Sequence, residues 1–310
     1  MTDGREATFR AFTGKQGSNY AQQRRDYHSR LYNAVTEHHV STGGQFGTLL
    51  DVGCGPGIAV RRLAPLFDHA IAIDPSEGMI ESALAIPNTS AKSGPIRFAV
   101  SSAETLGSDL SPAVPEASVD LLTAATAAHW FDVPKFWNRA ARVVKPGGTV
   151  ALWCGGFLYI KPTTPNHERI QAAIDKLEVL VDEYVVSGNR IARGAYVDLP
   201  LPWTVEPAVP EFERASFVRR EWGQGEGREP GDEFYNTHEM TVDMLVMVMG
   251  TASPVIRWRE ANPEKAGTEE DPLKVMKREI EAAFEDAGVE GGERVLKGGV
   301  QGALLLVKRK

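Results

Sequence analysis

The chain has few cysteines, no long hydrophobic run and little clustered positive charge. Its 310 residues contain only Cys54 and Cys154, too few for the disulfide framework of a small secreted protein. No apolar stretch approaches the ~20 residues that a membrane-spanning helix needs. Residues 1–10 carry charges where a signal peptide would be apolar. These absences predict a cytoplasmic protein with no membrane partner.

The balance of charge argues against nucleic acid as a partner. The net charge is −7 at pH 7, whereas a protein that binds nucleic-acid phosphates needs a basic face. The one basic cluster, residues 308–310, is typical of a solvated chain end. Hydrophobic residues make up 42% of the chain, which is ample for a core, and the length permits one large domain or two small ones.

What the chain does contain is a set of glycines directly after an apolar segment. Residues 48–52 run into Gly53, Gly55 and Gly57, and an amphipathic stretch follows. This order predicts a strand, a tight turn and a helix, which is the entry to a nucleotide-type α/β unit. Glycine is needed in such a turn because its backbone reaches φ values closed to other residues and brings no Cβ toward a ligand.

Two acidic residues near this turn indicate which ligand it holds. Dinucleotide enzymes favour G-x-G-x-x-G, in which a pyrophosphate caps the helix, but here the glycines alternate and Asp51 precedes them. A carboxylate there would repel a pyrophosphate and suits a ligand with an ammonium group. Asp74 ends the next apolar run, where an acid can accept hydrogen bonds from ribose hydroxyls. Together they predict S-adenosylmethionine rather than NAD, with a ligand-free corner as the remaining alternative.

Residues 48–154 resemble class I S-adenosylmethionine-dependent methyltransferases. The segments that match occur in the family's order: 49–57, 71–79, 101–104, 118–122 and 142–150. More narrowly, residues 127–132 and the neighbourhood of Tyr20 and Arg24 resemble the trans-aconitate methyltransferase-like group. The resemblance implies a small-molecule methyltransferase that uses S-adenosylmethionine and releases S-adenosylhomocysteine.

Hydrophobic periodicity predicts alternating strands and helices over the first half of the chain. Helices are expected at residues 18–40, 57–66, 76–86 and 133–144. Strands are expected at residues 48–52, 70–73, 96–100, 119–124 and 148–154. Such alternation implies a parallel sheet with right-handed crossovers.

The second half follows a different pattern. Helices are expected at 166–186, 237–249 and 271–287, and strands at 215–222 and 303–307. The segment 187–213 is rich in proline and is expected to form no regular helix or ladder. The two late strands fit the antiparallel strands six and seven that the resemblance implies. The insertion between strands five and six, with the helix at 237–249, is expected to form a lid over the acceptor.

The expected fold is α/β, a Rossmann-like seven-stranded and mostly parallel sheet with helices on both faces. The resemblance implies the strand order 3-2-1-4-5-7-6, with a helical lid inserted between strands five and six. We expect an N-terminal helical cap at residues 1–46, a donor-binding core at 47–154, and an acceptor side at 155–310 that adds the lid and the last two strands. All three parts belong to one domain, and the sequence carries no signal for an oligomeric state.

The expected donor-binding residues surround the glycine turn and the two strand ends. We expect Asp51 at the donor's amino group or an ordered water, and Asp74 at the ribose hydroxyls; capping the turn or the next helix is the plain alternative for each. Ser76 is an equally good cap for that helix, which leaves Asp74 for the ligand. The resemblance completes the donor-binding set with Tyr20, Arg24, Gly53, Gly55, Ser76, Met79, Ala103 and Glu104. No metal site is expected.

The acceptor is expected beyond strand four, because ligands in open α/β sheets bind at the carboxyl ends of the strands. His129 follows that strand and is the candidate catalytic residue, as a general base or, as we prefer, as a group that positions the acceptor. Trp130, Phe131, Trp153 and Tyr159 are expected to line the acceptor pocket. For the aromatic rings, a role in core packing is the alternative.

The donor determines what the acceptor pocket must do. A sulfonium methyl group is already activated, so the protein has to align a nucleophile at about 3–3.5 Å and exclude water. A carboxylate acceptor needs no base but does need a cation, and the candidates in the lid are Arg190, Arg193, Arg219, Arg220 and Arg257. We expect an oxygen nucleophile, carboxylate or hydroxyl, of an organic acid or secondary metabolite. The alternatives are an NAD(P)-dependent oxidoreductase and a non-catalytic protein that binds the donor.

Overall fold

A computed structural model describes residues 13, 14, 17, 21, 25–87, 89–223, 233–236 and 240–310. Two residues of the expected donor site, Tyr20 and Arg24, lie outside these described residues. Among the described residues, no helix is both long and apolar enough to cross a bilayer.

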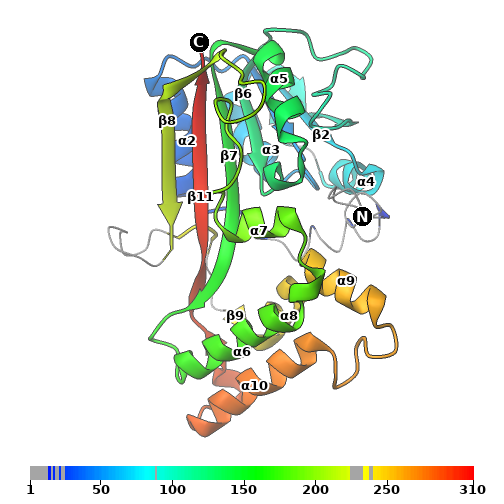
Figure 1. Ribbon diagram of the computed structural model, residues 1–310, viewed down its shortest axis with the longest axis vertical. Coiled ribbons are helices and arrows are strands. Elements are labelled where there is room, and N and C mark those ends of the chain that lie inside the picture. The colour runs from blue at the N-terminus through cyan, green and yellow to red at the C-terminus, as the bar shows by residue number, and fades with distance from the viewer. Residues whose placement is uncertain are drawn as a thin grey trace.

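A seven-stranded sheet organises the chain, in the order β5-β2-β1-β6-β7-β11-β8 (Figure 1). Its strands are β1 (Thr48–Val52), β2 (His69–Asp74), β5 (Arg97–Val100), β6 (Val119–Ala125), β7 (Val144–Ile160), β8 (Phe212–Trp222) and β11 (Gly298–Arg309). Counted along the chain, this is the order 3-2-1-4-5-7-6. The predicted fold class, a mostly parallel Rossmann-like sheet with flanking helices, is confirmed.

One strand reverses the direction of the sheet. The five strands from β5 to β7 pair in parallel, whereas β11 pairs antiparallel with both β7 and β8. Strands six and seven are therefore antiparallel to each other, as expected, but β8 points in the same direction as the five parallel strands. Only β11 runs against the other six strands of this sheet.

Both faces of the sheet are buried, which explains why its strands read as apolar runs rather than as an alternation. Successive side chains point to opposite faces: Leu49 and Leu121 belong to one core cluster, and Leu50 and Leu122 to the other. The first cluster includes side chains of α2 (Ser29–Ser41) and α3 (Ile58–Leu63), and the second includes those of α5 (Val133–Val143). The helices thus cover both faces (Figure 1).

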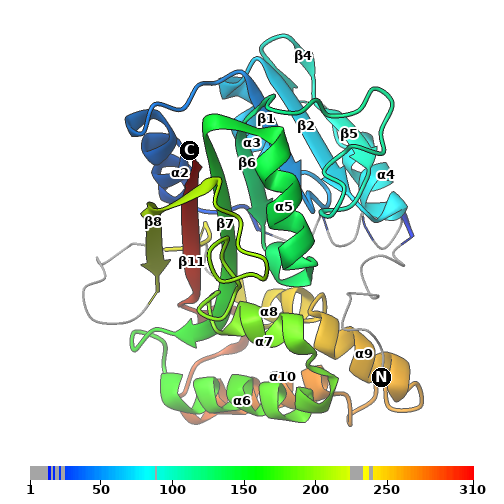
Figure 2. The same ribbon diagram turned by 45° about the horizontal axis from the view of Figure 1, so that its top comes forward.

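A helical lid stands beyond one end of the sheet, with α7 nearest to it (Figures 1 and 2). Between β7 and β8 the chain forms α6 (His167–Leu180), the 3₁₀ helix η3 (Asp182–Tyr184) and α7 (Ser187–Arg193). Between β8 and β11 it forms α8 (Val242–Met249), α9 (Ser253–Ala261) and α10 (Pro272–Asp286). The lid has its own apolar cluster, with Ile170, Leu177, Leu245, Ile280 and Phe284 at its centre.

The lid corrects the predicted topology. We placed it between strands five and six with one added helix, but three of its helices come from between strands six and seven. The long strands β7 and β11 carry both insertions, because they extend past the core and pair with each other along most of their length. The remaining short elements are α4 (Glu77–Ala85), η1 (Ala64–Leu66), η2 (Ala128–Trp130), η4 (Gly291–Glu293), β3 (Ser90–Ala91), β4 (Gly94–Pro95), β9 (Met240–Thr241) and β10 (Val295–Leu296).

One predicted helix has wrong limits, and two helices were not predicted. The expected helix at 18–40 does not run through residues 25–28, where Tyr27 forms an isolated antiparallel bridge with Tyr235, and α2 starts only at Ser29. Helix α7 forms inside the proline-rich segment, because its residues precede the first of those prolines. Helix α9 was not expected; its Pro254 lies in the first turn, where proline is tolerated.

Candidate active site

The turn after β1 requires glycine for two reasons. Gly53, Gly55 and Gly57 have φ values of 64°, 53° and 87°, a region that other L-residues rarely adopt. A Cβ on Gly53 would also lie 2.6 Å from the Cβ of Ala127, and one on Gly57 would lie 2.9 Å from the ring of Phe98. The turn is therefore held close against the start of the segment that follows β6.

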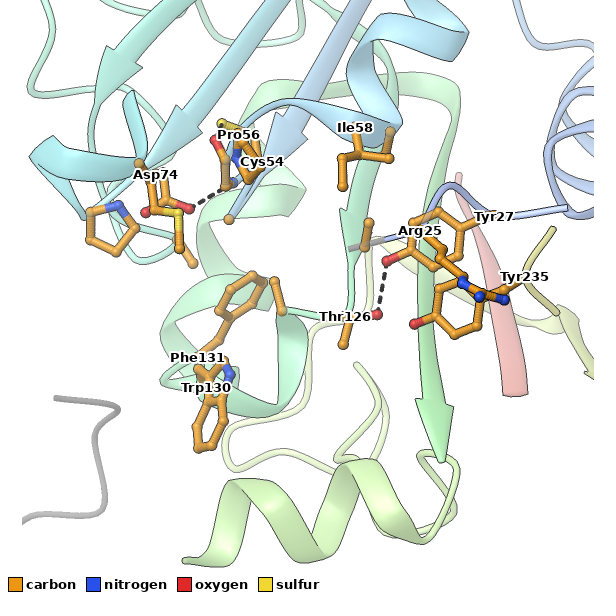
Figure 3. A pocket seen from close by; sticks show the side chains of 18 of the residues that line it. Arg25, Tyr27, Cys54, Pro56, Ile58, Asp74, Thr126, Trp130, Phe131 and Tyr235 are labelled. Atoms are coloured by element: carbon orange, nitrogen blue, oxygen red, sulfur yellow. Dashed lines mark hydrogen bonds between the residues drawn. The ribbon is translucent and has the colours of Figure 1, made fainter. Parts of the chain in front are cut away.

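Asp74, at the end of β2, fixes this turn and also faces a cavity. One carboxylate oxygen accepts a hydrogen bond from the backbone N–H of Gly55 at 2.9 Å (Figure 3), and the other accepts one from the N–H of Ser76 at 2.9 Å. The same carboxylate borders the cavity, where a carboxylate can accept hydrogen bonds from the hydroxyl groups of a ligand. Ser76 itself caps α4 by accepting from the N–H of Met79 at 3.3 Å, and it does not line the cavity.

The first cavity lies against the glycine turn. Six of the expected donor-binding residues line it: Gly53, Gly55, Asp74, Met79, Ala103 and Glu104. Figure 3 shows Asp74 and the turn on one side of the opening, Trp130 and Phe131 across from them, and Arg25, Tyr27 and Tyr235 on a third side. Glu104 also accepts a hydrogen bond from the N–H of Asp132 at 3.0 Å, which ties its loop to the start of α5.

Asp51 does not lie where the sequence placed it. The residue is fully buried, and its carboxylate accepts a hydrogen bond from the Thr123 hydroxyl at 2.6 Å, across from β1 to β6. Its other oxygen has no hydrogen-bond partner among the described residues. Burial raises the pKa of Asp51 to about 7, and the neighbouring charge of Asp74 adds to the rise. The structure thus corrects its position: Asp51 lies beneath the turn and not among the residues that line the cavity.

A second, larger cavity adjoins the first beneath the lid. Its volume is about 280 Å³, compared with about 140 Å³ for the first. Arg25, Thr126, Trp130 and Tyr235 line both cavities. A ligand in the first cavity and a ligand in the second would therefore lie next to each other beside these four residues.

The second cavity has mainly apolar walls. Strands β7 and β11 and helix α8 supply Leu158, Ile160, Leu245, Val248, Met249 and Val300. Its polar groups largely pair with one another: Arg193 forms an ion pair with Glu178, and Asn189 donates a hydrogen bond to Ser253 at 3.0 Å. Burial raises the pKa of Glu178, against the opposing effect of Arg193. Such a cavity suits a ligand with an apolar body.

The five arginines proposed to hold an anionic acceptor do not present a ready cation. Only Arg193 lines a cavity, and it is engaged by Glu178 and by Asp182. The other four line neither of the two cavities, since they pair with the lid or the sheet: Arg190, Arg219, Arg220 and Arg257. These four candidates are therefore wrong as pocket residues.

The cation that does line both cavities is Arg25, which the sequence analysis missed. Its Nη2 is buried without a hydrogen-bond partner among the described residues, and burial lowers its pKa. We assigned this region to one helix, in which Arg24 would share a face with Tyr20. Residues 25–28 belong to no helix, since Tyr27 forms a β-bridge and His28 is extended, so that helical spacing does not apply to Arg25. A guanidinium so placed matches a carboxylate.

His129 and its neighbours divide between the two cavities. The 3₁₀ helix η2 (Ala128–Trp130) follows β6 and places His129 in the second cavity, Trp130 in both, and Phe131 in the first only. His129 Nδ1 lies 3.0 Å from the hydroxyl of Tyr196. The expected position of Phe131 in the acceptor pocket is thus corrected to the donor side.

Two other expected acceptor residues lie elsewhere. Trp153 is fully buried and packs edge-on against Tyr27, with ring centroids 5.7 Å apart, in the cluster under α2. Its position on β7 turns it away from the cavity, because alternate residues of a strand face opposite sides. Tyr159 lies against Gly223 and Gly299 and lines neither cavity. Both assignments are corrected.

Tyr27 and Tyr235 are aromatic residues at the cavities that no local pattern indicated. Their rings stack at 5.1 Å with an interplanar angle of 22°, and the Tyr27 hydroxyl lies 2.9 Å from the Thr126 hydroxyl. The two tyrosines meet only through tertiary pairing of distant segments, so their spacing in the sequence carries no signal.

Comparison with known proteins gives matches to methyltransferases. Residues 50–152 match the family described as "Methyltransferase domain". A Dictyostelium discoideum protein assigned as a methyltransferase is 29% identical over 186 residues, which are 60% of this chain and 64% of that protein. A Saccharomyces cerevisiae protein assigned as an S-adenosylmethionine-dependent methyltransferase is 32% identical over 147 residues, which are 47% of this chain and 46% of that protein. The chain thus spans less than two thirds of these relatives' length.

A solved structure extends the likeness to the whole fold. A protein from Anaeromyxobacter dehalogenans, assigned as a type II methyltransferase, superposes with a TM-score of 0.59 at 25% identity, covering 92% of this chain and 97% of that one. The narrower trans-aconitate methyltransferase-like group is not reached by these matches and stays a prediction. The sheet order, the glycine turn beside Asp74 and the match of residues 50–152 to the family described as "Methyltransferase domain" together support a class I S-adenosylmethionine-dependent methyltransferase.

Proposed function

We propose that this protein transfers the methyl group of S-adenosylmethionine to an oxygen, carboxylate or hydroxyl, of a small organic acid or secondary metabolite. One observation carries the proposal. The donor-side cavity and the apolar cavity under the lid share Arg25, Thr126, Trp130 and Tyr235. A donor seated against the glycine turn therefore directs its reactive end toward a second, separate ligand.

The residues of the first cavity fit the parts of the donor. The carboxylate of Asp74 lines this cavity, where it would accept hydrogen bonds from the ribose hydroxyls. Met79 and Ala103 offer apolar surface for the adenine. The buried Nη2 of Arg25 lacks a partner among the described residues, and a donor carboxylate would supply one. The ribose, the adenine and the carboxylate of the donor thus each find a group of matching chemistry.

The second cavity favours an oxygen nucleophile over an amine. An amine is cationic near neutral pH, and a cation in an apolar cavity needs a carboxylate partner. Within the described lining of this cavity, the one acidic side chain is Glu178, which already pairs with Arg193. A hydroxyl on an apolar body avoids this requirement, whereas a carboxylate needs a cation, and Arg25 lines both cavities.

The protein's task in the transfer is alignment and exclusion of water. When bound, the donor supplies a methyl group on a cationic sulfur, which leaves as a neutral thioether. Thr126 and Trp130 shape the junction where the acceptor oxygen approaches, and the apolar walls of α8, β7 and β11 keep water from it. His129 borders the acceptor side of this junction, within reach of a polar group on the acceptor.

Transfer from methyl-labelled S-adenosylmethionine to a panel of apolar carboxylic acids, phenols and amines tests the proposal. We expect label in methyl esters or ethers. Label only in amines would contradict the oxygen acceptor. Binding of S-adenosylhomocysteine with no transfer to any member of the panel would favour the non-catalytic alternative. An NAD(P)-dependent oxidoreductase has no support in this site.

A matched pair of lid variants locates the acceptor. Val248 of α8 lines the second cavity, whereas Val179 of α6 is 75% exposed and lines neither cavity. We expect Val248→Lys to abolish transfer while leaving the affinity for S-adenosylhomocysteine unchanged, because it puts a charge into the apolar wall. Val179→Lys should behave as the wild type.

A further inference from the structure

A buried tyrosine approaches His129 from behind the acceptor cavity. Tyr196 is 1% exposed and follows α7, and its hydroxyl lies 3.0 Å from His129 Nδ1. Both Ala195 and Tyr196 have positive φ values, 50° and 60°, which are uncommon for residues with a Cβ. The chain thus adopts an unfavourable backbone conformation where it delivers this hydroxyl to the imidazole.

The surroundings of the Tyr196 hydroxyl decide which way its proton points. The residue is buried, and among the described residues the hydrogen-bond partner of this oxygen is His129 Nδ1. A phenol carries a single proton that it can donate. When that proton goes to His129 Nδ1, the phenol has an acceptor and the ring nitrogen has a donor.

The opposite arrangement is unfavourable. If His129 donated from Nδ1, the proton of the Tyr196 hydroxyl would be left in a buried place without an acceptor among the described residues. Burial raises the pKa of Tyr196 well above its ordinary value of 10, so the phenol keeps its proton. The imidazole is also packed against Trp130, with ring centroids 4.5 Å apart, which limits its freedom to turn over.

We propose that Tyr196 is a positioning residue that holds neutral His129 in the tautomer with its proton on Nε2. Nδ1 then accepts from Tyr196 and Nε2 is already protonated, so neither nitrogen can take a proton from the acceptor. His129 serves as a hydrogen-bond donor at the second cavity and not as a general base. This assignment deepens the proposed function, on which it rests, by favouring a carboxylate, which arrives deprotonated, over a hydroxyl.

Nitrogen-15 NMR of the full chain with labelled histidine side chains reads the tautomer directly. The chain has seven histidines, and His129→Gln assigns the signal. We expect an unprotonated Nδ1 and a protonated Nε2 in the wild type. In Tyr196→Phe we expect both nitrogen shifts to move toward a tautomer mixture. Tyr184→Phe is the matched control, since its hydroxyl accepts from Asn262 at 3.0 Å and lines neither cavity; its His129 signals should not move.

A wild-type spectrum with the proton on Nδ1 would overturn the assignment. The wild-type spectrum decides the tautomer of His129 even if Tyr196→Phe fails to fold. We expect Tyr196→Phe to lower kcat on a carboxylic acid roughly 10-fold, because the hydrogen-bond donor of His129 is then no longer held in position. The affinity for S-adenosylhomocysteine should stay unchanged. The predicted spectrum without any transfer to carboxylic acids would refute the proposed acceptor and leave the tautomer standing. The two failures are therefore distinguishable.

Discussion

At the scale of single residues, Asp74 holds the turn and faces the donor side at once. Replacing it with asparagine removes the charge but keeps one oxygen to accept from Gly55 or Ser76. We expect Asp74→Asn to weaken binding of S-adenosylhomocysteine roughly 10- to 100-fold, since hydrogen bonds to a charged group contribute about 1.5–3 kcal/mol. Isothermal titration measures this. Asp68→Asn is the control, because Asp68 forms an exposed ion pair with Lys92. Equal affinities in the wild type and in both variants would refute the assignment of Asp74 to the ribose.

Arg25 gives a prediction that separates parts of the donor. If its guanidinium binds the donor carboxylate, Arg25→Gln should weaken S-adenosylhomocysteine and leave 5′-methylthioadenosine, which lacks the amino-acid part, unaffected. We expect a loss of roughly 10-fold or more for the first ligand only. Arg142→Gln is the control, because Arg142 forms an exposed ion pair with Glu116. This variant should change the affinity for neither ligand. Equal losses for both ligands would show that Arg25 acts through the shape of the cavity.

Asp51 links stability to pH. Burial raises its pKa from an ordinary 3.8 to about 7. Because the folded pKa is the higher one, folding favours the protonated form; its stabilising effect is complete below about pH 4 and is lost as the pH rises through about 7. The loss amounts to at most about 4 kcal/mol, from roughly three pKa units at 1.36 kcal/mol each.

Asp51→Asn cannot ionise and therefore separates this effect from others. We expect the unfolding free energy of the variant, relative to the wild type, to rise between about pH 4 and about pH 7. Urea unfolding of both proteins across that range measures it. A difference that is the same at every pH would mean that Asp51 does not titrate in this window.

At the scale of elements, the contact between α7 and η2 positions the acceptor-side residues. A Cβ on Gly188 would lie 2.4 Å from the Trp130 ring and 2.7 Å from the His129 carbonyl oxygen, whereas one on Gly194 would meet nothing closer than 3.4 Å. We expect Gly188→Ala to displace α7 and reduce turnover at least about 10-fold, with donor affinity affected less. Gly194→Ala, at the C-cap of the same helix, should be close to wild type. Equal activities of the two variants would contradict the contact.

The elements also show what the sequence can and cannot predict. Strand β1 was predicted to the residue, because a buried apolar run is a local signal. The predicted helix at 133–144 matches α5, because its Asp132 cap and the proline in its first turn are also local signals. The break before α2 was missed because a bridge between Tyr27 and the distant Tyr235 sets it. Contacts between segments far apart in sequence leave no local pattern.

The same reasoning separates the two halves of the site. Gly53, Gly55 and Asp74 were located correctly at the cavity because strand ends of a parallel sheet meet at one edge, and the order of strands follows from the motifs. Trp153 and Tyr159 were misplaced because a strand residue's face depends on register. The acceptor side could not be predicted, since two separate insertions build the lid and their packing selects the residues that reach the cavity.

At the scale of the whole molecule, the sheet and the lid supply different parts of one reaction site. The turn after β1 and Asp74 at the end of β2 face the first cavity, and α8, β7 and β11 wall the second. The long strands β7 and β11 join the two, because both run from the core sheet into the lid. The chemistry proposed here depends on the two cavities meeting at Thr126 and Trp130.

A crystal structure of the protein with S-adenosylhomocysteine tests this arrangement most directly. The account predicts the ribose hydroxyls on the carboxylate of Asp74, and the sulfur at the junction between Thr126 and Trp130, facing the cavity under the lid. A ligand whose sulfur points away from that cavity, or a corner that takes up NAD⁺ and leaves S-adenosylhomocysteine unbound, would contradict it.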